Sequence, residues 1–380
     1  MYWQKEVLRS GRSLAFNGTD VLDLPKTGLL NSLILYFSST QNGQPFLSAV
    51  RWRLIDYISK IEVIANGSTV IKSYDGRQAL ASAWYDDGVE ATSMWRHYSN
   101  TPHRQWIPIH FGQRFMDDLH GLDLGRYDQV QLKITNIATS TEFTTDIQLD
   151  VIAIWNREPD VASRGYYREE DYHVWAPAAG TWEYIDLPTE LLIRRVLLRN
   201  RPGVVTATAK NASSMTRLME DIRFSINSRQ LDLWRGSLTQ LMHLAILELG
   251  RYAETMTNID RNDEMGYEVG VGYVIHGLPS EATSTATPSA ISTMGAADVQ
   301  DSAQEVQQRT ADQPLQGLWR GTGYGHCVPL YIARRADLKD HLDPAAKKVI
   351  TIDAQCASGT TVAGTHAAAE SAIVLSRLVP

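Results

Sequence analysis

At 380 residues the chain is longer than a single hydrophobic core usually supports, so two domains are expected. Its net charge of −7 argues against a nucleic-acid surface, because neutralising phosphates requires a basic excess, and no direct nucleic-acid binding is expected. No apolar run approaches the roughly 20 residues of a membrane span, and the first residues lack the apolar stretch of a secretory signal. These observations favour a protein that is made and assembled in the cytoplasm.

Residues 1–14 are expected to form an N-terminal arm that precedes the first domain. Aromatic and apolar side chains are interspersed there with basic ones: Tyr2, Trp3, Lys5, Val7, Leu8, Arg9 and Arg12. Such a segment is suited to rest on an anionic membrane surface or to clip onto a neighbouring subunit. The alternative is a short helix that packs on its own subunit.

One pattern then occurs twice, first within residues 15–160 and again within residues 161–380. In chain order, the first copy contains a Gly-Thr…Asp-Leu-Pro segment, a strand, a hairpin, a helical stretch and three further strands. These elements are expected at residues 18–25, 29–39, 61–76, 77–87, 107–111, 127–136 and 146–155. The hairpin turns at Asn66, and asparagine tolerates the positive φ that tight turns require.

The second copy repeats all of these elements, with Asn227 at its hairpin turn. They are expected at residues 180–188, 191–200, 222–236, 237–254, 328–332, 347–355 and 370–378. The early elements recur after about 162 residues and the late ones after about 221, so the second copy carries roughly 60 extra residues. We place this insertion at 251–318. Its tail, 280–313, is rich in Ser, Thr, Ala and Gln, which is typical of a long exposed loop or a partly disordered segment.

Short alternating strands with regular turn signals and few long helices predict an all-β protein. We expect two tandem antiparallel jelly rolls with short helical excursions and a long loop insertion in the second roll. Eight strands per roll is the number that suits a repeat of roughly 140 residues. The order of the strands does not follow from periodicity.

The sequence contains none of the common enzyme motifs. There is no GxSxG elbow, HExxH, P-loop or GxGxxG that follows a strand. Gly321, Gly323 and Gly325 form a glycine-rich run, but the lysine and the following helix of a phosphate cradle are missing. A flexible hinge at the end of the insertion is the favoured interpretation. We therefore expect no catalytic residue, no cofactor and no cofactor-binding residue.

No metal site is expected either. His103 and His110 flank Trp106 without further convergent ligands, and histidines at strand ends or interfaces are the favoured interpretation. The cysteines Cys327 and Cys356 are too few for a disulfide framework or a four-ligand zinc site, so reduced thiols are expected. An acidic cluster that lacks the twelfth-position Glu of a calcium loop is expected to be a solvated turn. It consists of Asp260, Asn262, Asp263 and Glu264.

Adjacent acids occur in three places: Asp86-Asp87, Asp117-Asp118 and Glu169-Glu170. Glycosidases need two carboxylates on opposing sides of the sugar. Neighbouring residues on a strand point to opposite faces, so these pairs do not supply that geometry and are expected to be solvent-exposed near turns. Three tryptophans in predicted strands are expected in the core or in a subunit interface, the alternative being a sugar-binding groove. These are Trp155, Trp182 and Trp234.

The succession of these segments resembles that of double jelly-roll major capsid proteins. The likeness is carried by the DLP…LL strand, the hairpin IEVIANGSTVIKSYDG, the helical excursion and IPIHFGQRFMDDLHGLDLGRYDQVQLKIT. This lineage includes the coat proteins of tailless, membrane-containing bacterial and archaeal viruses and, more distantly, the adenovirus hexon. The likeness spans Ser13 to Leu378 and rests on the duplicated pattern rather than on an invariant motif.

The resemblance implies a structural, non-enzymatic virion protein. Three chains would form a pseudo-hexagonal capsomer whose rolls stand roughly perpendicular to an icosahedral shell, with the insertion in an outward tower. Neighbouring capsomers, minor capsid proteins and an internal membrane (the last through the arm 1–14) would be its partners. The alternative is a carbohydrate-binding or carbohydrate-active double jelly-roll protein, and the missing secretion signal and acid pair weigh against it.

Overall fold

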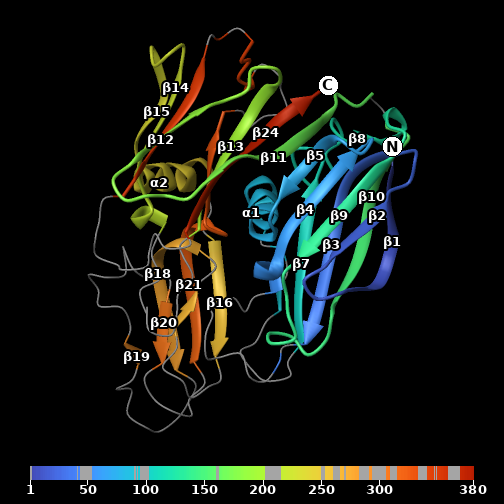
Figure 1. Cartoon of the computed structure of the whole chain (residues 1–380), viewed down its shortest axis with the longest axis horizontal. Coiled ribbons are helices and arrows are strands. Elements are labelled where there is room, and N and C mark those ends of the chain that lie inside the picture. Colours follow the sequence, from blue (N-terminus) through green and yellow to red (C-terminus); the bar gives the residue numbers. More distant parts are fainter. Residues whose placement is uncertain are drawn as a thin grey trace.

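The computed structural model shows an all-β protein in which two rolls lie side by side and a smaller group of strands extends from the second (Figure 1). The description covers residues 2–40, 42, 54–89, 91, 93–94, 102–159, 162–201, 215–249, 253–259, 266–268, 271–281, 291–292, 305–308, 315–332, 340–345, 347, 349–357 and 369–380. The two tandem jelly rolls predicted from the sequence are confirmed.

The first roll consists of two antiparallel sheets that enclose a core of Leu, Ile, Val and aromatic side chains. Its first sheet has the order β1-β10-β3-β7 and contains β1 (Tyr2–Leu14), β3 (Leu29–Thr40), β7 (Pro102–His110) and β10 (Ile147–Arg157), with the short β6 (Ser93–Met94) and β8 (Leu122–Asp123) beside β7 and β3. Its second sheet has the order β2-β9-β4-β5 and contains β2 (Thr19–Asp23), β4 (Ile58–Ala65), β5 (Thr69–Tyr74) and β9 (Val130–Asn136).

The second roll repeats this strand order. One sheet has the order β11-β24-β13-β22 and contains β11 (Tyr166–Trp175), β13 (Leu192–Arg201), β22 (Cys327–Tyr331) and β24 (Glu370–Val379). The other has the order β12-β23-β14-β15 and contains β12 (Trp182–Asp186), β14 (Met219–Ile226), β15 (Leu231–Ser237) and β23 (Ile350–Cys356). Eight principal strands per roll, in matching order, make the duplication seen in the sequence a duplication of the fold.

The predicted hairpins and helical stretches are confirmed in both rolls. Asn66 and Asn227 adopt φ values of 51° and 53°, so both hairpins turn where the sequence places a residue that tolerates the left-handed region. Each hairpin is followed by a helix, α1 (Gly76–Asp87) in the first roll and α2 (Leu238–Leu249) in the second. Short 3-10 turns lie at Leu54–Tyr57, Leu124–Arg126 and Met215–Arg217.

The expectation of an N-terminal arm or helix is wrong, because residues 2–14 form β1. This strand pairs antiparallel with β10 from Tyr2 opposite Arg157 to Leu14 opposite Ile147. It is the edge strand of its sheet, and its basic residues and the register shifts on either side of Arg9 are devices that blunt an exposed edge. The mixture of basic and apolar residues at 2–14, which suggested an arm, is therefore the composition of an edge strand.

The insertion between α2 and β22 contains strands. One three-stranded sheet has the order β16-β21-β18, formed by β16 (Ala253–Ile259), β18 (Val271–Glu281) and β21 (Leu315–Tyr324). A second has the order β17-β20-β19, formed by β17 (Gly266–Glu268), β19 (Ile291–Ser292) and β20 (Glu305–Gln308). The predicted loop 280–313 thus holds two strands, and most of its remaining residues lie outside the described ranges.

A short parallel pairing merges the two rolls. Strand β5 of the first roll pairs with β11 of the second at Lys72–Glu169 and Ser73–Glu170, which produces one eight-stranded sheet. In the first roll, one face of this sheet covers the core. The same face continues onto β11-β24-β13-β22, where it is the outer face of the second roll. Leu197 and Val374 on that outer face accordingly belong to the first core rather than the second.

Candidate functional site

The surface where the two rolls meet is built around α1. The helix begins with a capping box in which the Gln78 amide N–H donates to Asp75 Oδ1 at 2.7 Å and the Asp75 amide N–H donates to Gln78 Oε1 at 2.7 Å. Alanine and other strong helix formers fill its first turns, and nearly all of its residues are buried. The helix therefore lies between the two rolls, with its start fixed by the chain itself.

Aromatic side chains of α1 contact the outer face of the second roll. The Tyr85 hydroxyl donates to the carbonyl oxygen of Cys327 at 2.7 Å, and Trp84 stacks on Tyr324 with ring centroids 5.4 Å apart. Tyr331 donates in return to the Tyr85 carbonyl at 2.6 Å. These contacts couple the helix to β22 by both packing and hydrogen bonds.

A buried ionic cluster lies beside these rings. Glu169 Oε2 accepts from Lys72 Nζ at 3.0 Å, and Glu169 Oε1 accepts from Arg195 Nη2 at 2.8 Å. Arg194 and Arg195 both donate to Asp86 Oδ1 at 2.7 Å. All five side chains are almost completely buried, so every charge in the cluster has a partner of opposite sign.

The pKa of Glu169 shows the balance of forces in this cluster. Burial alone would raise the pKa, but the charges of Lys72 and Arg195 outweigh burial and hold it at about 2. Burial lowers the pKa of Lys72, and the charge of Glu169 opposes that effect. Arg195 stays charged, because its two carboxylate partners raise its pKa against the effect of burial. The arrangement suits a permanent structural joint.

The expectation that the paired acids are exposed is wrong for all of them except Asp118. Asp117, Glu169 and the side chain of Asp86 are buried, and Asp117 accepts from His120 Nδ1 at 3.0 Å. Two sequence signals pointed to such partners. Asp86 stands at the C-terminus of a helix, where the dipole disfavours negative charge, and Arg194-Arg195 interrupt an apolar strand.

Glu169 and Glu170 do point to opposite faces of β11, as the strand geometry predicts. Glu169 faces α1, whereas Glu170 pairs with Arg377 and with Arg168, the latter at 2.6 Å. Asp87, at the end of α1, pairs with His110 Nε2 at 2.8 Å. Five of the six adjacent acids therefore take part in structural ion pairs, and Asp118 is the exposed one.

The remaining residues singled out in the sequence lie apart from one another. His103 and His110 are buried near the two ends of β7, as predicted for strand-end histidines. Gly321 and Gly323 lie in β21, and Gly325 stands in the tight turn after it, where a Cβ would come within 3.0 Å of the Arg77 carbonyl oxygen. The glycine-rich run is therefore a buried strand end and turn rather than a flexible hinge. Cys327 and Cys356 are buried free thiols.

Within the described ranges, no three His, Cys, Asp or Glu side chains gather in a way that could hold a metal ion. The acidic cluster at 260–264 lies outside those ranges. None of the described helices is both long and apolar enough to cross a membrane.

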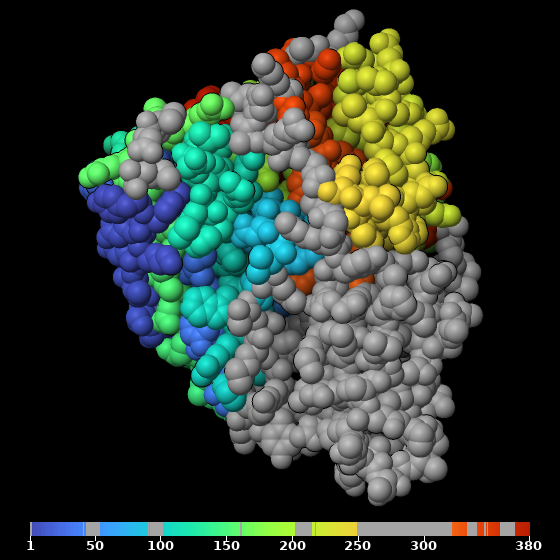
Figure 2. All heavy atoms as spheres, turned by 180° about the vertical axis from the view of Figure 1, so that it is seen from behind, coloured from blue at the N-terminus to red at the C-terminus, as the bar shows by residue number. Residues whose placement is uncertain are grey.

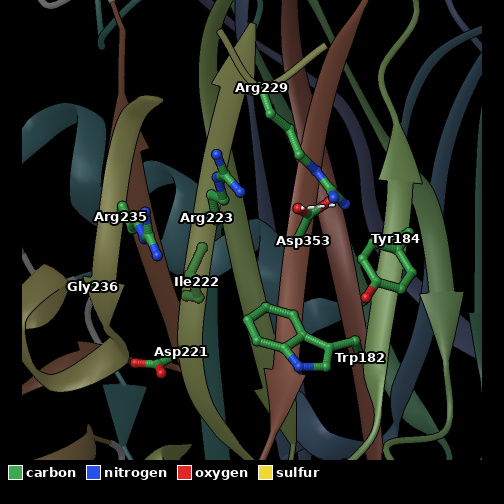
Figure 3. Close-up of a pocket in the computed structure, with 9 residues that line it drawn as sticks. All are labelled: Trp182, Tyr184, Asp221, Ile222, Arg223, Arg229, Arg235, Gly236 and Asp353. Carbon is green, nitrogen blue, oxygen red and sulfur yellow. Dashed lines mark ion pairs between the residues drawn. The ribbon is translucent and has the colours of Figure 1, made fainter. Parts of the chain in front are cut away.

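An open hollow of about 520 Å³ lies on the outer face of the sheet β12-β23-β14-β15 (Figure 3). Trp182 and Tyr184 line one side with rings 6.4 Å apart and nearly parallel, and Arg229 lies over the Tyr184 ring while it pairs with Asp353 at 2.9 Å. Trp182 is therefore exposed, whereas Trp155 is buried in the first core and Trp234 packs against the second. A platform of rings and guanidinium groups is suited to hold a flat polar ligand or a partner chain.

No protein-family model matches the sequence, and no curated protein matches it. Solved structures do match in fold. The major capsid protein of Sulfolobus turreted icosahedral virus aligns with a TM-score of 0.60 and 10% identity, over 100% of this chain and 98% of that one. The major capsid protein P2 of bacteriophage PM2 aligns with a TM-score of 0.52 and 9% identity, over 100% and 98%. A capsid chain of PBCV-1 gives 0.54 and 8%, over 99% and 93%.

These similarities cover both rolls and the insertion together. The chain thus has the double jelly-roll fold of viral major capsid proteins, as the succession of its segments predicted.

Proposed function

We propose that this protein is a structural major capsid protein and that three copies form a pseudo-hexagonal capsomer of an icosahedral virus shell. The observation that carries this proposal is the duplication: each chain supplies two rolls of the same strand order, joined by a buried helix. Three such chains present six similar blocks, which is what near-hexagonal tiling requires. The fold likeness to viral capsid proteins along the whole chain supports the same function.

The proposed location is the virion, after assembly in the host cytoplasm, with neighbouring capsomers and minor capsid proteins as partners. We assign no enzymatic activity to the chain, since its buried charges serve as structural partners to one another. Strand β1 is paired along its length with β10, so no membrane contact through a free N-terminal arm is proposed. The net charge of −7 supports a shell protein that does not bind the genome directly.

The first test is the mass of the purified protein, measured by light scattering behind a sizing column. We expect a species close to three times 42.5 kDa that persists on dilution, because obligate interfaces between subunits are large and apolar. Concentrated trimer would then be examined by electron microscopy for the formation of shells. A monomer at every concentration and salt condition would contradict the proposal.

The alternative considered from the sequence, a carbohydrate-binding protein, has no support from the fold likeness but can be tested directly. The hollow with the exposed rings of Trp182 and Tyr184 has the platform on which sugar rings stack. Calorimetric titration of a monomeric sample with a glycan panel distinguishes the two candidates. Binding that is lost in Trp182→Ala, in a protein that never forms trimers, would favour the carbohydrate function.

A further inference from the structure

The two helices occupy equivalent positions in the two rolls. Helix α2 begins with the same reciprocal hydrogen bonds as α1: the Gln240 amide N–H donates to Ser237 Oγ at 3.2 Å, and the Ser237 amide N–H donates to Gln240 Oε1 at 3.0 Å. Ser237 and Gln240 each lie 162 positions after their counterparts in α1. The shared capping box therefore fixes the register of one helix on the other.

This register pairs Tyr85 of α1 with Leu247 of α2. Tyr85 is 3% exposed because the second roll covers it, whereas Leu247 is 80% exposed. A leucine this exposed on a helix whose opposite side is buried is an apolar contact point that none of the described residues covers. The outward side of α2 thus lacks what the same side of α1 has.

The sheet face that α1 covers on the second roll has an equivalent on the first roll, and the cross-strand register identifies the matching residues. On the second roll, Leu197 pairs with both Pro329 and Val374, and this row lies on the face that α1 covers. On the first roll, Ile34 pairs with both Pro108 and Ile152 in the corresponding strands. Proline therefore stands at the same place in β7 and β22, on the outer face of each sheet.

The two rows differ in exposure. Leu197 and Val374 are buried, whereas the Ile34 row is half-buried and ends on the edge strand at Val7, which is 60% exposed. Next to that row, the rings of Tyr36 and Trp106 form a platform with centroids 4.4 Å apart. Trp106 occupies the β7 position that corresponds to Cys327, the residue that Tyr85 contacts in the second roll.

We propose that α2 of one copy packs on the outer face of the sheet β1-β10-β3-β7 of a second copy. This contact repeats between chains the joint that α1 makes within each chain, and it places Leu247 beside Trp106 and Tyr36. The inference rests on the proposed assembly into trimers and names the surfaces that form it.

The positions of the two surfaces suit such a contact. In Figure 2 the yellow atoms of β15 and α2 lie on one side of the molecule and the dark blue atoms of β1 on the opposite side. A contact between different surfaces of identical chains joins them head to tail, and such a contact closes into a ring when the rotation permits. The occupant is a second copy, because the apolar row and the exposed helix repeat the two halves of a joint already present in the chain.

The test is the substitution Leu247→Asp in the full chain. We expect the mass in solution to fall from trimer to monomer while the monomer still unfolds in one cooperative thermal transition, because Leu247 is exposed and its replacement leaves the core intact. The matched control is Val21→Asp on the outer face of β2, also exposed, which is expected to remain trimeric. A trimeric Leu247→Asp protein would overturn the inference and leave the proposed function standing, whereas a monomeric wild type would overturn the function itself.

Cross-linking provides an independent measurement. Chains carrying Leu247→Cys are co-expressed with chains carrying Tyr36→Cys, so that mixed trimers form, and the mixture is treated with a short bismaleimide. The native thiols are protected by burial. We expect covalently joined pairs from this mixture and none when Val21→Cys replaces Tyr36→Cys. Absence of linked pairs from a mixture that is trimeric by mass would contradict the proposed contact.

Discussion

Glu169 is the anion on which the joint between the rolls depends. Replacing it by glutamine leaves Lys72 and Arg195 buried with one carboxylate fewer, and breaking a buried pair in this way costs about 3–5 kcal/mol. We therefore expect Glu169→Gln to lower the free energy of unfolding by that amount at neutral pH, measured by chemical denaturation. The control is Glu62→Gln, which removes an exposed pair with Lys133 and should cost at most about 1 kcal/mol.

The same substitution carries a pH dependence. Because folding lowers the pKa of Glu169 from 4.5 to about 2, the carboxylate contributes its full stability above pH 4.5 and loses it as the pH falls towards 2. The difference in stability between wild type and Glu169→Gln should therefore shrink over that range in acid unfolding curves. A difference that stays constant down to pH 2 would show that Glu169 does not act as a buried anion.

At the scale of residues the sequence specified the turns but not which charged side chains pair with one another. The positive φ at Asn66 and Asn227 follows from local chemistry, so both turns were predictable. The pairing of Glu169 with Lys72 joins residues 97 positions apart, and nothing local specifies it. The adjacent acids were consequently assigned to solvent, although the unusual Asp86 at a helix C-terminus indicated a buried cation nearby.

At the scale of elements, the capping boxes of α1 and α2 set the positions from which both helices reach their partners. Ser237→Ala removes the cap of α2 and should lower the free energy of unfolding by about 1 kcal/mol. Asp75→Ala should cost more, since Asp75 also pairs with Arg199 at 2.8 Å. Ser237→Asp, which retains a capping oxygen, is the control. Equal losses in the two alanine variants would contradict the added role of the Arg199 pair.

Elements with a strong local signal were predicted well, and those defined by their neighbours were not. Strand alternation and the hairpin turns located most strands of both rolls, but not β11, over which no element was predicted. Strand β1 was missed because an edge strand carries charges for a reason that appears only once β10 lies beside it. Strands β19 and β20 were missed because they lie in a tail rich in Ser, Thr, Ala and Gln, which is typical of loops. Strand β18, by contrast, begins with Val-Gly-Tyr-Val-Ile, a strand-like composition that was overlooked.

At the scale of the whole molecule, the joint within each chain combines buried ion pairs with apolar packing, whereas the proposed joint between chains is apolar. Apolar contacts are not screened by salt, and the Debye length falls to about 3 Å at 1 M. The trimer mass should therefore remain unchanged when sodium chloride is raised from low concentration to about 1 M. Dissociation at high salt, measured by light scattering, would indicate that ion pairs between chains hold the assembly.

The architecture of two rolls was predictable because a duplication within one sequence reveals itself without a structure. Their attachment was not, because the β5–β11 pairing spans two residue pairs and joins separate domains. The candidate site was predictable only in part. Helix α1 was predicted from the sequence, but the surface against which it packs could not be predicted without the three-dimensional order of the strands.

The position of β24 has a consequence for synthesis. It is the last strand in chain order, yet it lies between β11 and β13 in the interior of the eight-stranded sheet (Figure 1). The eight-stranded sheet can therefore close only after residues 370–379 have been synthesised, and a chain that stops before Glu370 leaves a gap between β11 and β13. We expect such truncated polypeptides to be unable to complete the second roll and thus to be unfit for incorporation.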